Sequence, residues 1–319
     1  MPYETFNDLN TAVMRLYGEQ KYGEVLDLLV DAGAAFPDAA QQILYLRACM
    51  AVRVGQVDEA LRLIEEVLDR GGWYGEHLIW QTPSWVALQG HPAFEALATR
   101  HRERETAALA TAQPERVVRV PPGDPPPGGY PLFLSLHGNT QRAAPDVAAW
   151  EPITAQGWLL AAIQSSQMVG PNMYIWDDHA TALTEIADHY AALAAAYPLN
   201  PARVVIAGFS RGGEIALRAA LSGTLPATGF VLLGPGGPLM DTPDAWLPLL
   251  PGAAARGLRG VVLLGTADGA APQAAIRALV ESLTAHGLPC RLIDLPGLGH
   301  DYPRDPVATL TAALAFLFP

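Results

Sequence analysis

A serine bracketed by glycines stands where an apolar run gives way to a helical pattern. In the stretch VVIAGFSRGGEIAL, residues 204–217, Ser210 lies between Gly208 and Gly212. Because both glycines lack side chains, the chain can turn sharply from a strand into a helix and expose the serine hydroxyl. The unpaired N–H groups at the start of that helix would stabilise negative charge above the serine. We predict that Ser210 is a nucleophile; the alternative is an ordinary tight turn.

A serine hydroxyl needs a base that takes its proton and an acid that holds the base in the right tautomer. At this type of turn the chain order is serine, then acid, then histidine. Two histidines follow Ser210, namely His286 and His300. His286 ends a predicted helix and is typical of a cap, whereas His300 stands in the glycine-bracketed loop DLPGLGHDYP. We therefore predict that His300 is the base.

Asp268 is the predicted orienting acid. It follows a predicted strand in VVLLGTADGAAP, with enough chain before His300 for a crossover helix. Asp294 lies inside a predicted strand, Asp301 abuts the histidine, and the remaining candidates belong to the irregular segment 241–256. An aspartate in a DG pair is also a common turn residue, which is the alternative for Asp268.

A tetrahedral intermediate needs two N–H donors for its oxyanion. One is expected from the residue after the nucleophile, the backbone N–H of Arg211. The other is expected from the loop that opens with HGNT, where Gly138 lets the chain turn and Asn139 offers its N–H. We expect His137 to position this loop rather than to act as a base.

The segment QSSQMVGPNMYIWDDHA, residues 164–180, should lie on the same rim as these groups. We predict that Met168, Tyr174 and Trp176 bind the substrate through apolar contacts. In the alternative, Trp176 packs under the following helix and Asp177 caps that helix. We predict no metal site, because the adjacent residues of WDDH diverge at a helix start and the sequence shows no other cluster of ligands. We also expect no cofactor. Glu214, in the first turn of the helix after Ser210, suits the helix dipole and is assigned no chemistry.

Short apolar runs alternate with helical patterns from about residue 116 onward. The expected strands are PLFLSLHG, WLLAAIQ, ARVVIAGF, GFVLLGP, GVVLLGT and RLIDLPG, with RVVRV as an edge strand. Nearly continuous Val, Leu and Ile runs are typical of strands buried on both faces of a parallel sheet. We expect helices over residues 178–197, 212–221 and 272–286, and a last one from Pro306. This alternation predicts an α/β fold with a doubly wound, mostly parallel sheet.

In the first hundred residues the apolar side chains recur at helical spacing instead, and two segments of this part resemble each other. Tyr22 superposes on Val57 and Leu29 on Ile64, each 35 residues further on. We predict a small all-helical domain over residues 1–112 and a catalytic domain over 113–319, with the boundary near Gln113. Positions that suit the pattern of a tetratricopeptide repeat are Pro37, Gly55, Glu59, Ala60 and Val67. On these residues the segment resembles two degenerate copies of that repeat, which implies either a surface for a protein or peptide partner or a packing domain.

The second half resembles the α/β-hydrolases. The motifs LHGNT, GFSRGG, GTADG and GLGHDYP occur in that family's order between Arg116 and Pro319. Within the superfamily the chain is most similar to small carboxylesterases of the phospholipase/carboxylesterase and dienelactone-hydrolase type. It has serine where the dienelactone hydrolases have cysteine. The resemblance implies a serine hydrolase that cleaves a small or medium carboxylic ester, with thioesterase or oligopeptidase activity as alternatives.

Composition narrows the classes of partner. The net charge of -12 argues against nucleic acid and anionic membranes, because both attract basic surfaces. No stretch has the length of a membrane span and no signal peptide is recognised, so we expect a cytoplasmic protein. A different class remains open, a partner-binding protein whose hydrolase domain is an inactive scaffold.

Overall fold

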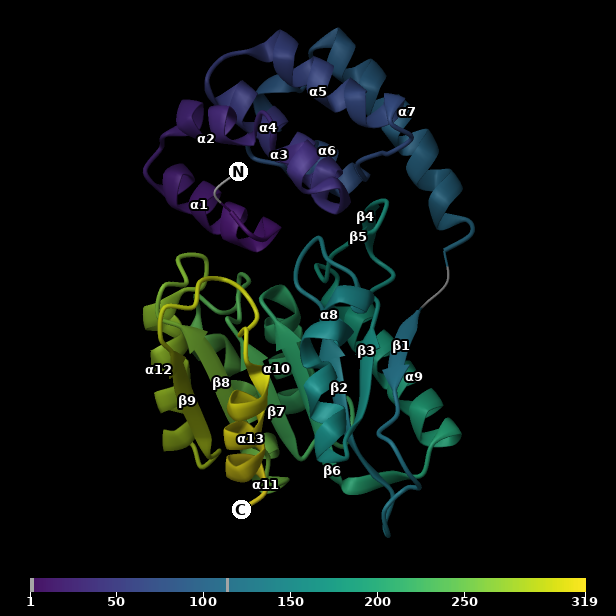
Figure 1. Ribbon diagram of the computed structural model, residues 1–319, viewed down its shortest axis with the longest axis vertical. Helices are drawn as coiled ribbons and strands as arrows, with labels where there is room; N and C mark the ends of the chain where they lie inside the picture. The colour runs from purple at the N-terminus through teal and green to yellow at the C-terminus, as the bar shows by residue number, and fades with distance from the viewer. Residues whose placement is uncertain (1–2, 113–114) are drawn as a thin grey trace. The chain divides into compact units, whose positions relative to one another are not determined.

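The computed structural model describes residues 3–112 and 115–319 (Figure 1). The chain divides into two compact units. A helical unit comprises residues 3–112 together with Met168–Met173, and a sheet unit comprises residues 115–167 together with Tyr174–Pro319. The predicted boundary at Gln113 lies outside the described residues.

The helical unit consists of short helices around a small aromatic core. Tyr74, Trp85 and Phe94 are fully buried within it, and the Tyr74 and Trp85 rings are 5.5 Å apart. The elements are α1 (Phe6–Gly18), α2 (Tyr22–Leu29), α3 (Ala32–Ala35), η1 (Pro37–Ala39), α4 (Ala40–Arg53), α5 (Val57–Asp69), α6 (Glu76–Gln81), η2 (Trp85–Leu88) and α7 (Pro92–Leu109). The helical character predicted for this half is confirmed, whereas the tetratricopeptide resemblance stays a prediction.

A hairpin from the middle of the chain packs within the helical unit. It is made of β4 (Met168–Gly170) and β5 (Met173–Tyr174). The Gly75 N–H, just before α6, donates to the Val169 carbonyl over 2.8 Å. Most of the hairpin therefore belongs to the helical unit, although its sequence lies within the second half of the chain.

A seven-stranded sheet in the order β1-β3-β2-β6-β7-β8-β9 forms the centre of the sheet unit. The edge strand β1 is antiparallel to β3, and the remaining neighbours are parallel. The strands are β1 (Arg116–Arg119), β2 (Tyr130–Leu136), β3 (Leu159–Ile163), β6 (Leu199–Phe209), β7 (Gly229–Leu233), β8 (Arg259–Gly265) and β9 (Cys290–Leu295). The predicted doubly wound, mostly parallel sheet is confirmed.

Helices cover both faces of this sheet, and alternate residues of each strand face opposite layers (Figure 1). Leu132 and Leu134 of β2 belong to the core on one face of the sheet, and Phe133 belongs to the core on the other face. The helices that contribute to the first core are α9 (His179–Ala196), α10 (Arg211–Ser222), η4 (Pro243–Leu249), α11 (Leu250–Ala255) and α12 (Gln273–Ala285). Those that contribute to the second core are α8 (Ala143–Trp150), η3 (Glu151–Gln156) and α13 (Pro306–Leu317). Burial on both faces explains why the strands are apolar throughout.

Two details differ from the sequence prediction. The strand β6 begins at Leu199, before the expected Ala202, because Tyr130 pairs with Leu199 and donates its N–H to the Pro198 carbonyl over 2.7 Å. The proline-rich segment 241–256, left without a prediction, forms η4 and α11. Among the described residues, no helix combines the length and the hydropathy that a membrane span needs.

Gly260 on β8 faces the aromatic ring of its cross-strand partner Phe230. A Cβ at Gly260 would lie 2.0 Å from the Phe230 Cζ, and both residues are buried. We expect Gly260→Ala to lower the free energy of unfolding by about 1–3 kcal/mol, because the ring must move within a packed core. Urea unfolding checks this, with Gly252→Ala on α11 as control, where the nearest atom to an added Cβ is 3.7 Å away. Equal stability of the two variants would contradict the packing argument.

Candidate active site

Ser210 occupies a strained turn between β6 and α10. Its φ of 52° lies in the left-handed region that residues with a Cβ rarely adopt. Backbone hydrogen bonds hold it there. Its N–H donates to the Leu233 carbonyl over 3.0 Å, and its carbonyl accepts from the Gly213 and Gly236 N–H groups over 2.9 and 3.0 Å. Such strain persists only where the surrounding structure enforces it.

The glycines on either side of Ser210 are sterically required. A Cβ at Gly208 would lie 2.2 Å from the Gly212 carbonyl oxygen. At Gly212 it would lie 2.4 Å from the carbonyl oxygens of Leu136 and His137. The turn therefore packs backbone against backbone, which is the steric reason proposed for these glycines from the sequence.

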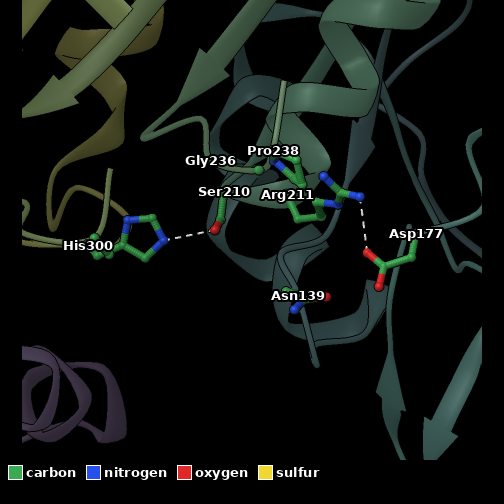
Figure 2. Close-up of a pocket in the computed structure, with 9 residues that line it drawn as sticks. Asn139, Asp177, Ser210, Arg211, Gly236, Pro238 and His300 are labelled. Carbon is green, nitrogen blue, oxygen red and sulfur yellow. Dashed lines mark hydrogen bonds and ion pairs between the residues drawn. The ribbon is translucent and has the colours of Figure 1, made fainter. Parts of the chain in front are cut away.

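Ser210, His300 and Asp268 form one continuous chain of hydrogen bonds. The Ser210 hydroxyl lies 2.9 Å from the His300 Nε2, and a dashed line marks this contact in Figure 2. The His300 Nδ1 donates to the Asp268 Oδ2 over 2.8 Å. The three residues come from the ends of β6, β8 and β9, which meet at the carboxyl edge of the sheet. The structure therefore brings together the three side chains that the sequence singled out.

Asp268 is buried, with 4% of its surface exposed. Burial by itself raises the pKa of this carboxyl, but the opposing hydrogen bond from His300 and those from the Ala270 and Ala271 N–H groups leave the pKa below its usual 3.8. Asp268 is consequently a carboxylate at neutral pH and can orient the imidazole and stabilise its protonated form.

A second buried aspartate fixes the loop that carries His300. The Tyr302 hydroxyl donates to the Asp146 Oδ1 over 2.6 Å. Asp146, on α8, also accepts hydrogen bonds from Trp150 over 3.1 Å and from Ser135 over 2.5 Å. The sequence analysis missed this network. An isolated carboxylate in the apolar helix AAPDVAAW, residues 143–150, was the available signal.

Tilted aromatic contacts complete the support of the histidine. The Phe209 ring lies 4.8 Å from the His300 ring and 4.7 Å from the Tyr302 ring, centroid to centroid. Phe209 is the last residue of β6 and is 3% exposed. The imidazole is therefore held from one side by the nucleophile's own strand, and the loop behind it is anchored to α8.

The expected donors for an oxyanion lie beside Ser210. Arg211 is the first residue of α10, so its backbone N–H has no partner within the helix. Asn139 and Arg211 both line the same cavity as Ser210 (Figure 2). The arrangement suits charge stabilisation above the serine.

His137 is buried and supports the loop that carries Asn139. Its Nδ1 donates to the Gly138 carbonyl over 2.8 Å, and its Nε2 accepts from the Ser165 N–H over 3.2 Å. Burial lowers the pKa of His137 to about 4, so its imidazole is neutral at pH 7. These contacts agree with the loop-positioning role expected from the sequence.

The cavity around Ser210 is small, with a volume of about 260 Å³. Its lining residues are Asn139, Asp177, Ser210, Arg211, Gly236, Gly237, Pro238, Ala270 and His300. Glycines and small side chains make up most of this wall, so the space suits a short substrate. Within the described residues, no group of three or more His, Cys, Asp or Glu side chains could hold a metal ion.

The three residues predicted to bind substrate do not line this cavity. The prediction is wrong for Trp176, whose side chain is fully buried and donates its Nε1–H to the His137 carbonyl over 2.9 Å. Tyr174 is absent from the lining, and Met168 belongs to the helical unit. Trp176 therefore supports the loop that carries His137 rather than the cavity wall.

The alternative for this segment is wrong in one residue. The N-cap of α9 is Asp178, whose carboxylate accepts from the Ala180 and Thr181 N–H groups over 3.0 and 3.1 Å. Asp177 instead lies in the cavity wall, where its Oδ1 accepts from the Arg211 Nη2 over 3.0 Å (Figure 2). Glu214 is fully buried and pairs with the Arg211 Nη1 over 2.5 Å, so it does more than complement the helix dipole.

The Asp146 network generates a prediction about pH. Burial raises the pKa of Asp146 from 3.8 to about 6, against its three hydrogen bonds. As pH rises from 4 to 6, the unfolded chain loses this proton before the folded chain does, so folding becomes less favourable. The difference between the two pKa values, 3.8 in the unfolded chain and about 6 in the folded one, corresponds to about 3 kcal/mol of unfolding free energy. We expect the wild type to lose up to that free energy relative to Asp146→Asn between pH 4 and pH 7.

Urea unfolding of the two proteins at several pH values measures this difference directly. The comparison cancels the other carboxyl groups, because both proteins carry them. If the unfolding free energies of the two proteins changed in parallel with pH across this range, the raised pKa of Asp146 would be contradicted.

Comparisons with known proteins agree with this architecture. Residues 5–109 match the family described as A/B hydrolase-like, N-terminal domain. The chain is similar along its length to an uncharacterized protein from Bacillus cereus ATCC 10987, with 23% identity, a TM-score of 0.54, and 98% and 99% of the two chains covered. A search among curated proteins found no match.

Two further solved structures resemble the sheet unit. Esterase PE8 is 20% identical with a TM-score of 0.51, covering 65% of this chain and 100% of its own. A carboxylesterase from Bacillus cereus is 16% identical with a TM-score of 0.50, covering 67% and 99%. Together with the sheet order and its flanking helices, these likenesses show that the second half of the chain has the α/β-hydrolase fold.

Proposed function

We propose that this protein is a serine hydrolase that cleaves small carboxylic esters through an acyl-enzyme intermediate. The observation that carries the proposal is the unbroken hydrogen-bond chain from Ser210 through His300 to Asp268. The serine of this chain lies on a strained strand-to-helix turn with a positive φ, and such strain is frequent at active sites. The esterases among the similar structures share the fold and support the same reaction class.

In the proposed reaction the Ser210 Oγ attacks the ester carbonyl while the His300 Nε2 takes its proton. Asp268 holds the imidazole in the correct tautomer and stabilises its positive charge. The backbone N–H groups of Arg211 and Asn139 bind the oxyanion. His300 then returns the proton to the leaving alcohol. Water, deprotonated by the same imidazole, attacks the acyl-Ser210 ester and regenerates the serine.

The catalytic groups do not distinguish esters from other acyl substrates, whereas the size of the cavity favours short ones. Thioesters and amides react through the same intermediate, so thioesterase and oligopeptidase activity remain alternatives within this proposal. A volume of about 260 Å³ lies below the usual range for drug-sized ligands, which favours a short ester. A protein or peptide partner for the helical unit stays a prediction, as does a cytoplasmic location.

Removing the proposed nucleophile or base gives a direct test. We expect Ser210→Ala and His300→Ala to lower kcat/KM for 4-nitrophenyl acetate by at least about 10³-fold, and Asp268→Asn by a similar factor, because each breaks the proton transfer. The matched control is His286→Ala. That histidine is exposed and caps α12 through a contact with the Ser282 carbonyl. It should leave kcat/KM within about twofold of the wild type, since a surface substitution of this kind leaves the site intact.

Circular dichroism must show that each variant is folded. Wild-type turnover in a folded Ser210→Ala protein would rule out the proposed mechanism. If His286→Ala lost activity and His300→Ala kept it, the base would be His286 and the assignment of His300 would be wrong.

A further inference from the structure

The turn between β2 and α8 carries Asn139 and is strained. The Gln141 N–H donates to the Gly138 carbonyl over 3.2 Å and closes a four-residue turn, and we call residues 138–141 the oxyanion turn. Thr140 within it has a φ of 56°, in the left-handed region that β-branched residues rarely adopt. Asn139 lines the cavity (Figure 2). Because such a conformation persists only where its surroundings enforce it, the contacts of this turn decide where Asn139 lies.

The Gln141 side chain stabilises the oxyanion turn from within. Its Oε1 accepts a hydrogen bond from the Gly138 N–H over 3.1 Å. Gly138 is buried, and a Cβ there would lie 2.8 Å from the same oxygen. Loss of the Gln141 amide would leave a buried N–H without this acceptor, so the backbone of the turn would shift toward another partner.

The segment that follows the hairpin of β4 and β5 holds the same turn from outside. The Tyr174 N–H donates to the Gln141 carbonyl over 3.2 Å, and the two residues form an isolated antiparallel bridge. The Trp176 Nε1–H donates to the carbonyl of His137, the residue before the turn, over 2.9 Å. Gln141 is therefore bonded through its side chain to the start of the turn and through its backbone to Tyr174.

The hairpin itself is fixed within the helical unit. Val169 is 2% exposed, and its carbonyl accepts the hydrogen bond that begins just before α6. A Cβ at Gly170 would lie 3.0 Å from the Trp73 carbonyl oxygen, so the two backbones approach closely. The chain then passes from Met173, in the helical unit, directly to Tyr174, in the sheet unit. One peptide bond thus connects a buried part of the helical unit to the partner of the oxyanion turn.

From this connection we propose that the helical unit positions the oxyanion turn through the hairpin, with Gln141 as the positioning residue. The inference rests on the proposed ester hydrolysis at Ser210 and gives the helical unit a role in that reaction. Neither Gln141 nor the hairpin lines the cavity, so both act through the turn. Oxyanion donors are needed when the carbonyl carbon becomes tetrahedral, so their displacement slows the chemical steps more than it weakens substrate binding.

Two substitutions test the two ends of this connection. Gln141→Leu removes the side-chain acceptor and keeps a similar size. Val169→Asp places a carboxylate where the hairpin is buried and should release the hairpin from the helical unit. We expect each to lower kcat for 4-nitrophenyl acetate about 10- to 100-fold, the effect of a displacement of about 1 Å. The KM should stay within about twofold of the wild type, because acylation and deacylation use the same donors.

Matched controls carry the same substitutions at exposed positions. Val86→Asp lies in the helical unit, where the valine is 55% exposed. Gln56→Leu changes an exposed glutamine whose side chain makes no capping hydrogen bond to α5. Both should keep kcat within about twofold of the wild type. Circular dichroism must show that every variant is folded, and Gly170→Ala replaces Val169→Asp if the latter is not.

Inhibition by trifluoroacetone reads the oxyanion donors directly. The Ser210 Oγ adds to the ketone carbon, its proton passes to the His300 Nε2, and the ketone oxygen becomes the oxyanion of a hemiketal. The inhibition constant should rise in Gln141→Leu and Val169→Asp by the factor by which kcat/KM falls, because this adduct resembles the transition state. A variant that was only partly folded would lose active sites, while those that remained would keep the wild-type inhibition constant.

The inference and the proposed hydrolysis fail in distinguishable ways. If the wild type hydrolyses the ester but either test variant keeps the wild-type kcat, the positioning role is overturned and the hydrolase stands. A lower kcat with an unchanged inhibition constant would overturn it too, as would an equal loss in Val86→Asp. If the wild type neither hydrolyses the ester nor binds trifluoroacetone, both proposals are overturned.

Discussion

The close approach of two backbone segments around Ser210 is the constraint on which the site depends. Gly208 and Gly212 let the end of β6 and the start of α10 come within contact of each other and of the strand β2. That approach forces Ser210 into a positive φ and exposes its hydroxyl at the carboxyl edge of the sheet. It also places Arg211, the first residue of α10, in the wall of the same cavity. This one turn therefore places the proposed nucleophile and the residue expected to donate to the oxyanion next to each other.

Two buried aspartates near His300 illustrate how local donors set the state of a carboxyl group. Asp268 accepts from two backbone N–H groups and from the imidazole, and its pKa is lowered. Asp146 accepts from Ser135, Tyr302 and Trp150, and burial outweighs these bonds, so its pKa rises to about 6. The first is suited to stabilise a developing imidazolium ion. The second holds the histidine loop by accepting the hydrogen bond from Tyr302, and it becomes protonated as the pH falls through about 6.

The sequence predicts those features that depend on local pattern. Continuous apolar runs follow from burial of the strands on both faces, and the glycines around Ser210 follow from the sharp turn. Contacts between distant residues have no such pattern. Tyr302 and Asp146 are 156 positions apart, so nothing in either segment predicts their hydrogen bond. Asp177 and Asp178 are adjacent in the sequence, so the pattern does not tell which of them caps α9. The backbone conformation at the start of the helix makes Asp178 the N-cap.

The central claim is that Ser210 is activated by His300, and covalent labelling tests it most directly. The protein is exposed to a fluorophosphonate, its intact mass is measured, and the modified residue is located by peptide mapping. The account predicts a single adduct on Ser210, formed at a rate that falls by orders of magnitude in a folded His300→Ala variant. An adduct on another residue, or labelling of Ser210 at an unchanged rate without His300, would contradict it.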